Sequence, residues 1–175
     1  MWHYQRGMRY KSADVVVRLL VDIVSKNGCL LLSVPLRGDG TIDADEESFL
    51  VGMAQWMKIN EEGIFGTRPW HVFGEGPTNS RGGMFNERSL DYTAEDMRFT
   101  TKDGTLYVYL LATPAGAITV NSLADGAKYA QPVAEVKLFG SDETLRWEQS
   151  NEGLVIEKPV KMPDQNVVAF KVIFK

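Results

Sequence analysis

Residues 23–42 read IVSKNGCLLLSVPLRGDGTI, and this stretch decides how the rest of the chain is interpreted. Gly28 stands just after an apolar helical pattern, where a left-handed helix cap is expected. Leu30–Val34 is continuously apolar, which is typical of a parallel strand covered on both faces. Pro35 ends this strand, and Gly38-Asp39-Gly40 predicts a tight turn. The order of helix, buried strand and turn indicates a parallel α/β unit.

A helix is predicted on each side of this strand. Ser12 is an expected N-cap, and the almost wholly apolar run Val15–Val24 after it indicates a mostly buried helix. Asp43 and Glu46 form a capping-box pattern at the start of the second helix. The apolar residues of that helix fall on one face at helical spacing: Phe49, Leu50, Met53, Trp56 and Met57. A single parallel strand is not a sheet, so this unit is predicted to need neighbours that the sequence does not contain.

From His71 onward the helical pattern disappears and short strands are predicted. Asp103-Gly104 lies between two strand-like segments, and this dipeptide strongly favours a two-residue hairpin. Further strands are expected near Ile118–Val120, Ala134–Phe139, Leu145–Glu148, Leu154–Lys158 and Val167–Phe174. Several short strands separated by turns indicate an antiparallel β-sandwich. Gly74–Arg88, rich in Gly, Asn, Ser and Pro, is predicted to be a long connecting loop.

Composition excludes several classes of function. The net charge of −4 is spread over interspersed acids and bases, so neither a nucleic-acid partner nor a disordered charged tail is expected. No apolar run is long enough to span a membrane, and no membrane partner is expected. Cys29 is the single cysteine, so no internal disulfide can form, and its apolar neighbours predict a small buried side chain. Trp2–Lys11 is polar and aromatic, so no signal peptide is expected within this chain.

These motifs resemble the α-L-fucosidases of glycoside hydrolase family 29, over nearly the whole chain. The positions that carry the resemblance are Val24–Ser33, Gly38–Gly40, Trp56, Ile64–Trp70 and Asp96–Lys102 with Leu106-Tyr107. Cys29 and Ser33 stand where asparagines are common in the family, and Pro35-Leu36 replaces the usual Gly-Pro.

The resemblance implies an α+β protein in two parts. Residues 1–70 are expected to be the terminal βα piece of a (β/α)₈-like barrel, and residues 71–175 a C-terminal β-sandwich. It also implies a retaining, exo-acting glycosidase for terminal α-L-fucose, with two carboxyl groups about 5–5.5 Å apart. The family's nucleophilic aspartate and fucose-holding histidines lie upstream of these motifs and map to no residue here. This segment by itself is therefore expected to be inactive, with the remainder of the barrel and a fucosylated glycan as its partners.

Trp2 is the one residue for which the resemblance implies a ligand contact. Trp2-His3-Tyr4-Gln5 is similar to the family's Ser-Phe/Trp-Gly-Tyr segment, whose aromatic residue packs on the methyl group of the sugar. The alternative for Trp2 is a core residue or a loose chain end. His3 stands where the family has glycine, and a lone histidine there is expected at the surface.

Other polar and aromatic candidates favour structural roles. Asp39 between two glycines is expected to form a turn, and Asp43, Asp45, Glu46 and Glu47 are expected to match the helix dipole. Glu61 and Glu62 are expected to be solvated at a helix end. His71 is expected at the surface, and Trp56, Trp70 and Trp147 are expected in the core. No cluster has metal-ligand spacing, and no cofactor is expected.

Two alternatives to an enzyme fragment stay open. The segment after residue 70 could be a non-catalytic carbohydrate-binding β-sandwich, or it could serve only to brace a barrel. In the latter case the apolar side of residues 12–60 would drive association into a homo-oligomer. The resemblance leaves localisation unknown, because family members are often secreted, periplasmic or lysosomal.

Overall fold

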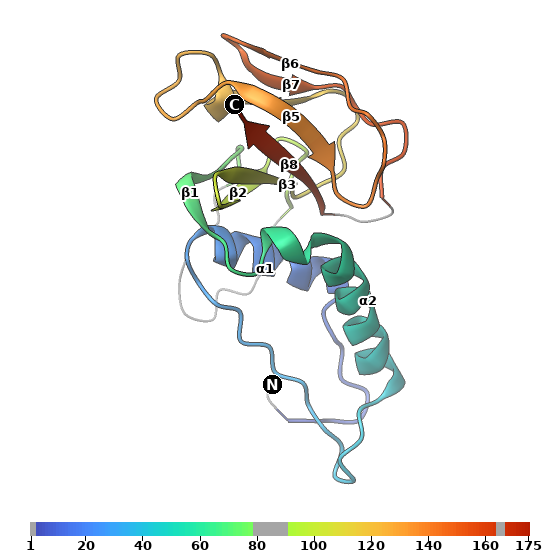
Figure 1. The fold of residues 1–175 in the computed structure, drawn as a ribbon. Coiled ribbons are helices and arrows are strands. Elements are labelled where there is room, and N and C mark those ends of the chain that lie inside the picture. Colours follow the sequence, from blue (N-terminus) through green and yellow to red (C-terminus); the bar gives the residue numbers. More distant parts are fainter. Residues whose placement is uncertain (1–2, 79–90, 164–166) are drawn as a thin grey trace.

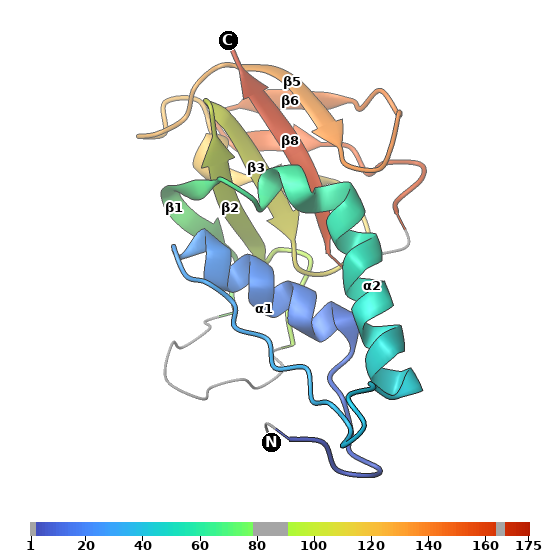
Figure 2. The ribbon, with the colours of Figure 1, turned by 60° about the horizontal axis from the view of Figure 1, so that its bottom comes forward.

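The computed structural model describes residues 3–78, 91–163 and 167–175. Two helices form a layer beneath a β-sandwich, and an extended arm formed by Gly28–Asp43 projects from the helices, away from the sandwich (Figure 1). The N-terminal segment lies beside this arm, on the side of the helices away from the sandwich, and the C-terminus lies in the sandwich (Figure 2). The predicted α+β class is confirmed.

Helix α1 spans Ala13–Ser25, and Ser12 caps its start by accepting a hydrogen bond from Val15 N at 3.4 Å. The expected left-handed residue at its end is Asn27 (φ 67°), so the prediction for Gly28 is wrong by one position. Gly28 N donates to Ile23 O at 2.9 Å, which completes a Schellman-type cap. A Cβ at Gly28 would lie 2.7 Å from Ile23 Cγ2, so this glycine permits the close approach of the chain to the helix.

Helix α2 spans Ala44–Asn60 and continues into the short 3₁₀ helix η1, Glu61–Gly63. Its predicted N-cap is confirmed, because Asp43 Oδ1 accepts a hydrogen bond from Glu46 N at 2.9 Å. Phe49 and Trp56 are buried on the predicted apolar face, and Trp56 Nε1 donates to Val167 O at 2.8 Å.

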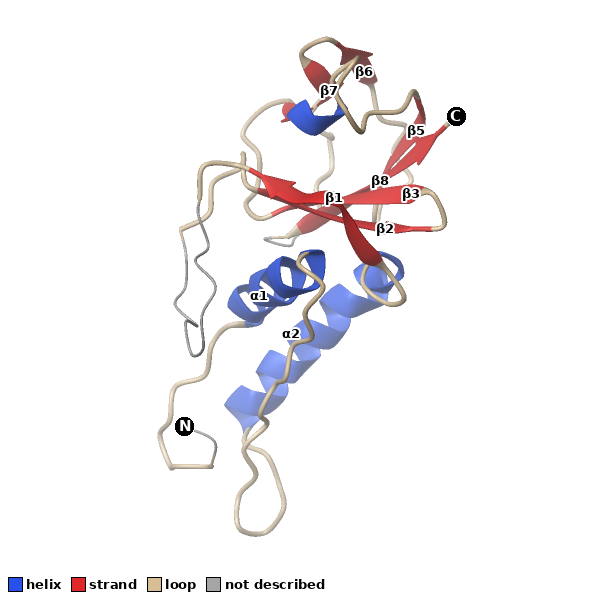
Figure 3. Cartoon of the chain, turned by 90° about the vertical axis from the view of Figure 1, so that its left-hand side faces the viewer, coloured by secondary structure: helices blue, strands red, loops and turns tan. Residues whose placement is uncertain are grey.

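Within the described residues, all strand pairs are antiparallel and form two sheets. The five-stranded sheet has the order β1-β2-β3-β8-β5, and the three-stranded sheet has the order β4-β7-β6. Figure 3 shows β6 and β7 on one side of the large sheet and the two helices on its other side. The strands are β1 Arg68–Glu75, β2 Met97–Lys102, β3 Thr105–Leu110, β4 Ile118–Val120, β5 Val133–Leu138, β6 Trp147–Ser150, β7 Gly153–Ile156 and β8 Val168–Phe174; the 3₁₀ helix η2, Asn121–Leu123, follows β4.

The large sheet is buried on both faces. In β3, Leu106, Val108 and Leu110 face the core between the sheets. The alternate side chains Tyr107 and Tyr109 pack against the helices in a second core. This double burial explains why β3 reads as a continuous apolar run although its neighbours are antiparallel.

Strand β1 was not predicted, because Pro69 and Gly74 obscure its pattern. It is an edge strand, and its register with β2 shifts between Pro69 and Gly74. Proline is tolerated on an edge strand, and glycine is typical of a bulge. A Cβ at Gly74 would lie 2.1 Å from Met97 O, so the close approach of β2 requires glycine there. Gly74 and Glu75, predicted to lie in a loop, belong to β1, whereas residues 79–88 of that predicted loop lie outside the described residues.

The predicted strand at Leu30–Val34 is wrong, since this part of the arm contains no assigned strand. Cys29, predicted to be buried, is exposed, and Leu31 is 96% exposed. The physical reason is the absence of paired neighbours in the described chain, because a parallel strand needs adjacent strands for its hydrogen bonds and its burial.

The predicted Asp-Gly hairpin is confirmed. Asp103 (φ 50°) and Gly104 (φ 78°) both adopt the positive φ that a type I′ turn requires. Replacing Gly104 with alanine should lower the free energy of unfolding by about 1 kcal/mol because of left-handed strain. Chemical denaturation measures this change. Gly38→Ala is the matched control: Gly38 has no positive φ and has open space around its Cβ position, so a loss there as large would contradict the explanation.

Candidate functional site

The segment that carries the proposed ligand residue lies at the end of the arm. Trp2 itself is outside the described residues. His3 is exposed as predicted, with its Nε2 3.2 Å from Gln5 Nε2. The Arg37 guanidinium lies over the ring of Tyr4, with its carbon Cζ 5.7 Å from the ring centroid. The chain leading to Trp2 is thereby placed beside the turn at residues 37–41, at the end of the molecule farthest from the sandwich (Figure 2).

The arm next to this segment exposes apolar side chains. Leu31 is 96% exposed and Leu36 is 56% exposed, and Leu32 also faces solvent. Adjacent exposed leucines on an extended backbone are typical of a surface that another part of a protein covers.

Asp39 has the turn-forming role that its sequence context predicted. Asp39 Oδ1 accepts hydrogen bonds from Thr41 N at 3.0 Å and from Thr41 Oγ1 at 2.7 Å. These hydrogen bonds hold the pKa of Asp39 below its usual value. The carboxylate therefore fixes the turn at the tip of the arm.

A polar cluster joins the N-terminal segment to the start of α2. Tyr10 Oη donates to Asp43 Oδ2 at 2.8 Å, while Asp43 Oδ1 caps the helix. Burial and this hydrogen bond raise the pKa of Tyr10 to about 12. The Glu46 N–H and then the Tyr10 hydroxyl lower the pKa of Asp43, which outweighs its partial desolvation.

Glu46 belongs to the same cluster and lies in the first turn of α2, where an acid matches the helix dipole as the sequence predicted, but its burial was not predicted. Its side chain is buried, with the residue 2% exposed, and Oε2 has no hydrogen-bond partner among the described residues. Burial and then the charge of Asp43 raise the pKa of Glu46. Sequence reasoning missed this because a capping-box pattern does not reveal which side chains cover the helix start.

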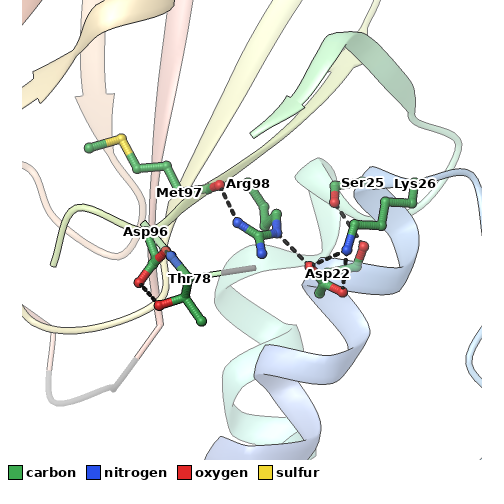
Figure 4. A network of polar contacts seen from close by, with 7 residues as sticks. All are labelled: Asp22, Ser25, Lys26, Thr78, Asp96, Met97 and Arg98. Carbon is green, nitrogen blue, oxygen red and sulfur yellow. Dashed lines mark hydrogen bonds and ion pairs between the residues drawn. The ribbon is translucent and has the colours of Figure 1, made fainter. Parts of the chain in front are cut away.

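A second polar network fastens the helical layer to the sandwich (Figure 4). Arg98, from β2, is 2% exposed and pairs through Nε with Asp22 Oδ1 of α1 at 2.5 Å. Lys26 pairs with the other oxygen of Asp22 at 2.8 Å. The rings of Phe73 and Tyr92 lie 5.5 and 5.6 Å from the Arg98 guanidinium carbon. Arg98 therefore connects α1, β1 and β2.

Glu62 contributes to a third contact between the layers. Glu62 Oε1 accepts hydrogen bonds from Tyr107 Oη at 2.9 Å and from Lys171 Nζ at 2.6 Å. The hydrogen bond from Lys171 is the main cause that lowers the pKa of Glu62. Partial burial acts in the opposite direction, and the hydrogen bond from Tyr107 lowers the pKa further. Glu62 is exposed, as predicted, and in addition it accepts these two hydrogen bonds from the sandwich.

The remaining aromatic candidates lie in the sandwich and its core. Trp56 and Trp70 are buried as predicted, and Trp147 packs partly buried against the main core. His71 is exposed, as expected, and stacks on Tyr129 with ring centroids 4.3 Å apart. These residues lie in the layers that form the fold.

The described ranges contain no group of three His, Cys, Asp or Glu side chains suited to hold a metal ion. In the same part of the chain, neither helix is both long enough and apolar enough to cross a bilayer.

Comparison with known proteins places both parts of the chain in one enzyme family. The family model described as alpha-L-fucosidase matches residues 1–62, and the model described as alpha-L-fucosidase C-terminal domain matches residues 90–175. An alpha-L-fucosidase from Branchiostoma floridae is 25% identical over 94% of this chain and 33% of its own length. A plasma alpha-L-fucosidase from Pongo abelii is 29% identical over 90% of this chain and 31% of its own length.

Solved structures give the same result. The crystal structure of Thermotoga maritima alpha-fucosidase in complex with fucose aligns with a TM-score of 0.75 and 26% identity. The alignment covers 98% of this chain and 37% of that protein. The chain thus spans about a third of the length of the relatives that it matches.

Proposed function

Because this chain belongs to the alpha-L-fucosidase family, we propose that it is the C-terminal part of a retaining, exo-acting α-L-fucosidase. The whole protein would remove terminal α-L-fucose from oligosaccharides or glycoconjugates. The observation that carries this proposal is the ordered match of two fucosidase models, residues 1–62 and then residues 90–175, on a single chain.

The proposed division places residues 1–70 in the catalytic barrel and residues 71–175 in the C-terminal sandwich. Strand β1, Arg68–Glu75, crosses this boundary, and residues 68–70 already pair with or pack on the sandwich sheet. The exposed leucines of the arm support a partner that covers residues 28–36. We assign that role to the remainder of the barrel, whose parallel strands would supply the missing neighbours of Leu30–Val34.

Trp2 is the residue that we propose touches the sugar. An indole face suits the apolar methyl-bearing side of fucose, and such contacts act alongside the hydrogen bonds of a sugar site. The neighbouring Tyr4 is braced by Arg37, which supports a fixed course for the segment next to Trp2.

The test compares two polypeptides on an aryl α-L-fucoside. The purified 175-residue chain should give no turnover, because the proposed carboxylate pair lies outside it. The longer protein should hydrolyse the fucoside with retention of configuration. Turnover by the 175-residue chain that a substitution within it abolishes would overturn the proposal.

In the longer protein, Trp2→Ala should lower kcat/KM about tenfold, which corresponds to ~1.4 kcal/mol. Trp2→Phe is the matched variant and should retain most of the activity because it keeps an aromatic face. Equal activity of the alanine and phenylalanine variants would remove Trp2 from the site.

A further inference from the structure

The two segments that lead into the helices meet on the side of the molecule away from the sandwich (Figure 2). Residues 3–11 lead into α1, and residues 35–43 lead into α2. In a barrel of alternating strands and helices, the connection that enters each helix lies at the carboxyl end of the preceding strand, on the face that carries the active site. In the longer protein, the contact between these two segments is therefore expected on that face.

Two contacts fasten the first segment to the second. The Arg37 guanidinium covers the ring of Tyr4, at 5.7 Å from Cζ to the ring centroid. Nearer to α1, Tyr10 Oη donates to Asp43 Oδ2 at 2.8 Å. The second contact fixes the segment where it approaches the helix, and the first holds the part that is closest in sequence to Trp2.

Arg37 is itself held by the turn that follows it. Its Nη1 donates to Ile42 O at 3.0 Å and to Thr41 Oγ1 at 3.4 Å, and its backbone N–H donates to Thr41 O at 2.8 Å. Asp39 Oδ1 closes the same turn by accepting hydrogen bonds from Thr41 N and Thr41 Oγ1. The planar guanidinium loses little further freedom when it also covers a ring. The turn thus presents Arg37 to Tyr4 in a fixed position.

We propose that Arg37 is a positioning residue for the sugar contact proposed for Trp2. Trp2 stands two positions before Tyr4, and two residues of chain span at most about 7 Å, so an anchored Tyr4 limits where the indole can reach. Because the indole is proposed to face the methyl group of fucose, its placement sets how strongly the enzyme prefers a sugar that carries this group. This inference rests on the proposed function, since it concerns the fucose site of the longer protein.

The test measures steady-state kinetics of the longer protein on two aryl glycosides. One is the α-L-fucoside, and the other is identical except that hydrogen replaces the methyl group of the sugar. Arg37→Ala should raise KM for the fucoside about three- to fivefold, the effect of losing an exposed cation–π contact, with kcat changed less than about twofold. The preference for the fucoside, taken as the ratio of the two kcat/KM values, should fall by the same factor.

Two further variants isolate the effect. Arg146→Ala is the matched control, because Arg146 is an arginine of the sandwich whose side chain is 84% exposed and lies 3.9 Å from Glu157. It should leave KM and the preference unchanged. In a Trp2→Ala background, Arg37→Ala should not lower the preference further, because both residues act through one contact with the sugar.

The 175-residue chain gives a readout that needs no substrate. The NMR order parameter of the Tyr4 amide should fall below about 0.6 in Arg37→Ala, as in a flexible segment, and should keep its wild-type value in Arg146→Ala. An order parameter that Arg37→Ala leaves unchanged would show that Arg37 does not hold Tyr4, and would overturn the inference.

Three kinetic results would also overturn it while fucoside hydrolysis by the longer protein still supports the proposed function. The first is an unchanged KM and preference in Arg37→Ala. The second is a fall in kcat alone, which a smaller folded fraction produces. The third is an equal effect of Arg37→Ala with and without the Trp2 indole. A wild-type longer protein that hydrolyses no fucoside would reject the proposed function and this inference with it.

Discussion

Replacing Arg98 with alanine is expected to lower the free energy of unfolding by about 3–5 kcal/mol, since it removes one partner of a buried ion pair. Arg98 is 2% exposed, and its loss would also leave Met97 O without the donor that now lies at 2.8 Å. The contacts of the guanidinium with the Phe73 and Tyr92 rings would disappear as well. Denaturation by urea, monitored by circular dichroism, measures the loss.

The matched control is Lys26→Ala, which removes the more exposed cation that pairs with the same Asp22 carboxylate. It should lower the free energy of unfolding by about 1 kcal/mol or less, as expected for a solvent-screened pair. Equal losses for the two variants would show that the burial of Arg98 does not set the strength of the network.

The same network predicts a pH dependence with a defined sign. Partial burial of Asp22 raises its pKa, but the hydrogen bonds from Lys26 and Arg98 outweigh it and hold the pKa below the usual 3.8. A carboxyl with a depressed folded-state pKa stabilises the protein above its unfolded pKa, and this contribution is lost as the pH falls below 3.8 toward the folded value. Asp22→Asn should flatten this acid limb of the stability profile.

Replacing Trp56 with alanine is expected to lower the free energy of unfolding by about 3–5 kcal/mol through loss of buried area and creation of a cavity. Trp56 is 4% exposed and lies in the second core, between α2 and the outer face of the large sheet. Its ring lies 6.3 Å from that of Tyr109, and its indole N–H satisfies Val167 O.

Trp56→Phe separates these contributions, because it keeps most of the apolar volume and removes the indole donor. We expect a loss of about 1–2 kcal/mol from the orphaned carbonyl of Val167 and the smaller ring. Equilibrium urea denaturation of the two variants gives both values. A phenylalanine variant as unstable as the alanine variant would assign the whole effect to the hydrogen bond.

The local elements with their own chemical signals were predictable from the sequence. Ser12 and Asp43 cap the helices as expected, and Asp103-Gly104 forms the expected hairpin, because each signal depends on only a few consecutive residues. The strand expected near Val167–Phe174 is confirmed as β8, and its alternate residues Val168, Phe170 and Val172 all reach the main core. Strand β1 escaped detection because its proline and its bulge glycine are allowed only by its position at the sheet edge.

In the candidate site, too, some residues could be identified from the sequence and others only from the tertiary structure. Trp2 was identified through a resemblance of consecutive residues, and its contact with a sugar stays a prediction. Glu46 could not be found from the sequence, because its burial depends on how the N-terminal segment, the arm and α2 meet. Arg98 could not be found from the sequence either, because a basic residue in a strand gives no local sign that it pairs with Asp22, 76 positions away in a helix.

The sequence by itself determined the family resemblance, the helix caps, the hairpin and most of the strands, because these follow from short-range backbone preferences and apolar periodicity. Only the tertiary structure decided that Leu30–Val34 forms no strand, that Cys29 is exposed and that Glu46 Oε2 is buried with no hydrogen-bond partner among the described residues. The physical reason is that burial and strand pairing depend on neighbours from distant segments. The apolar run Leu30–Val34 favours a buried strand, but a strand forms only where other strands pair with it.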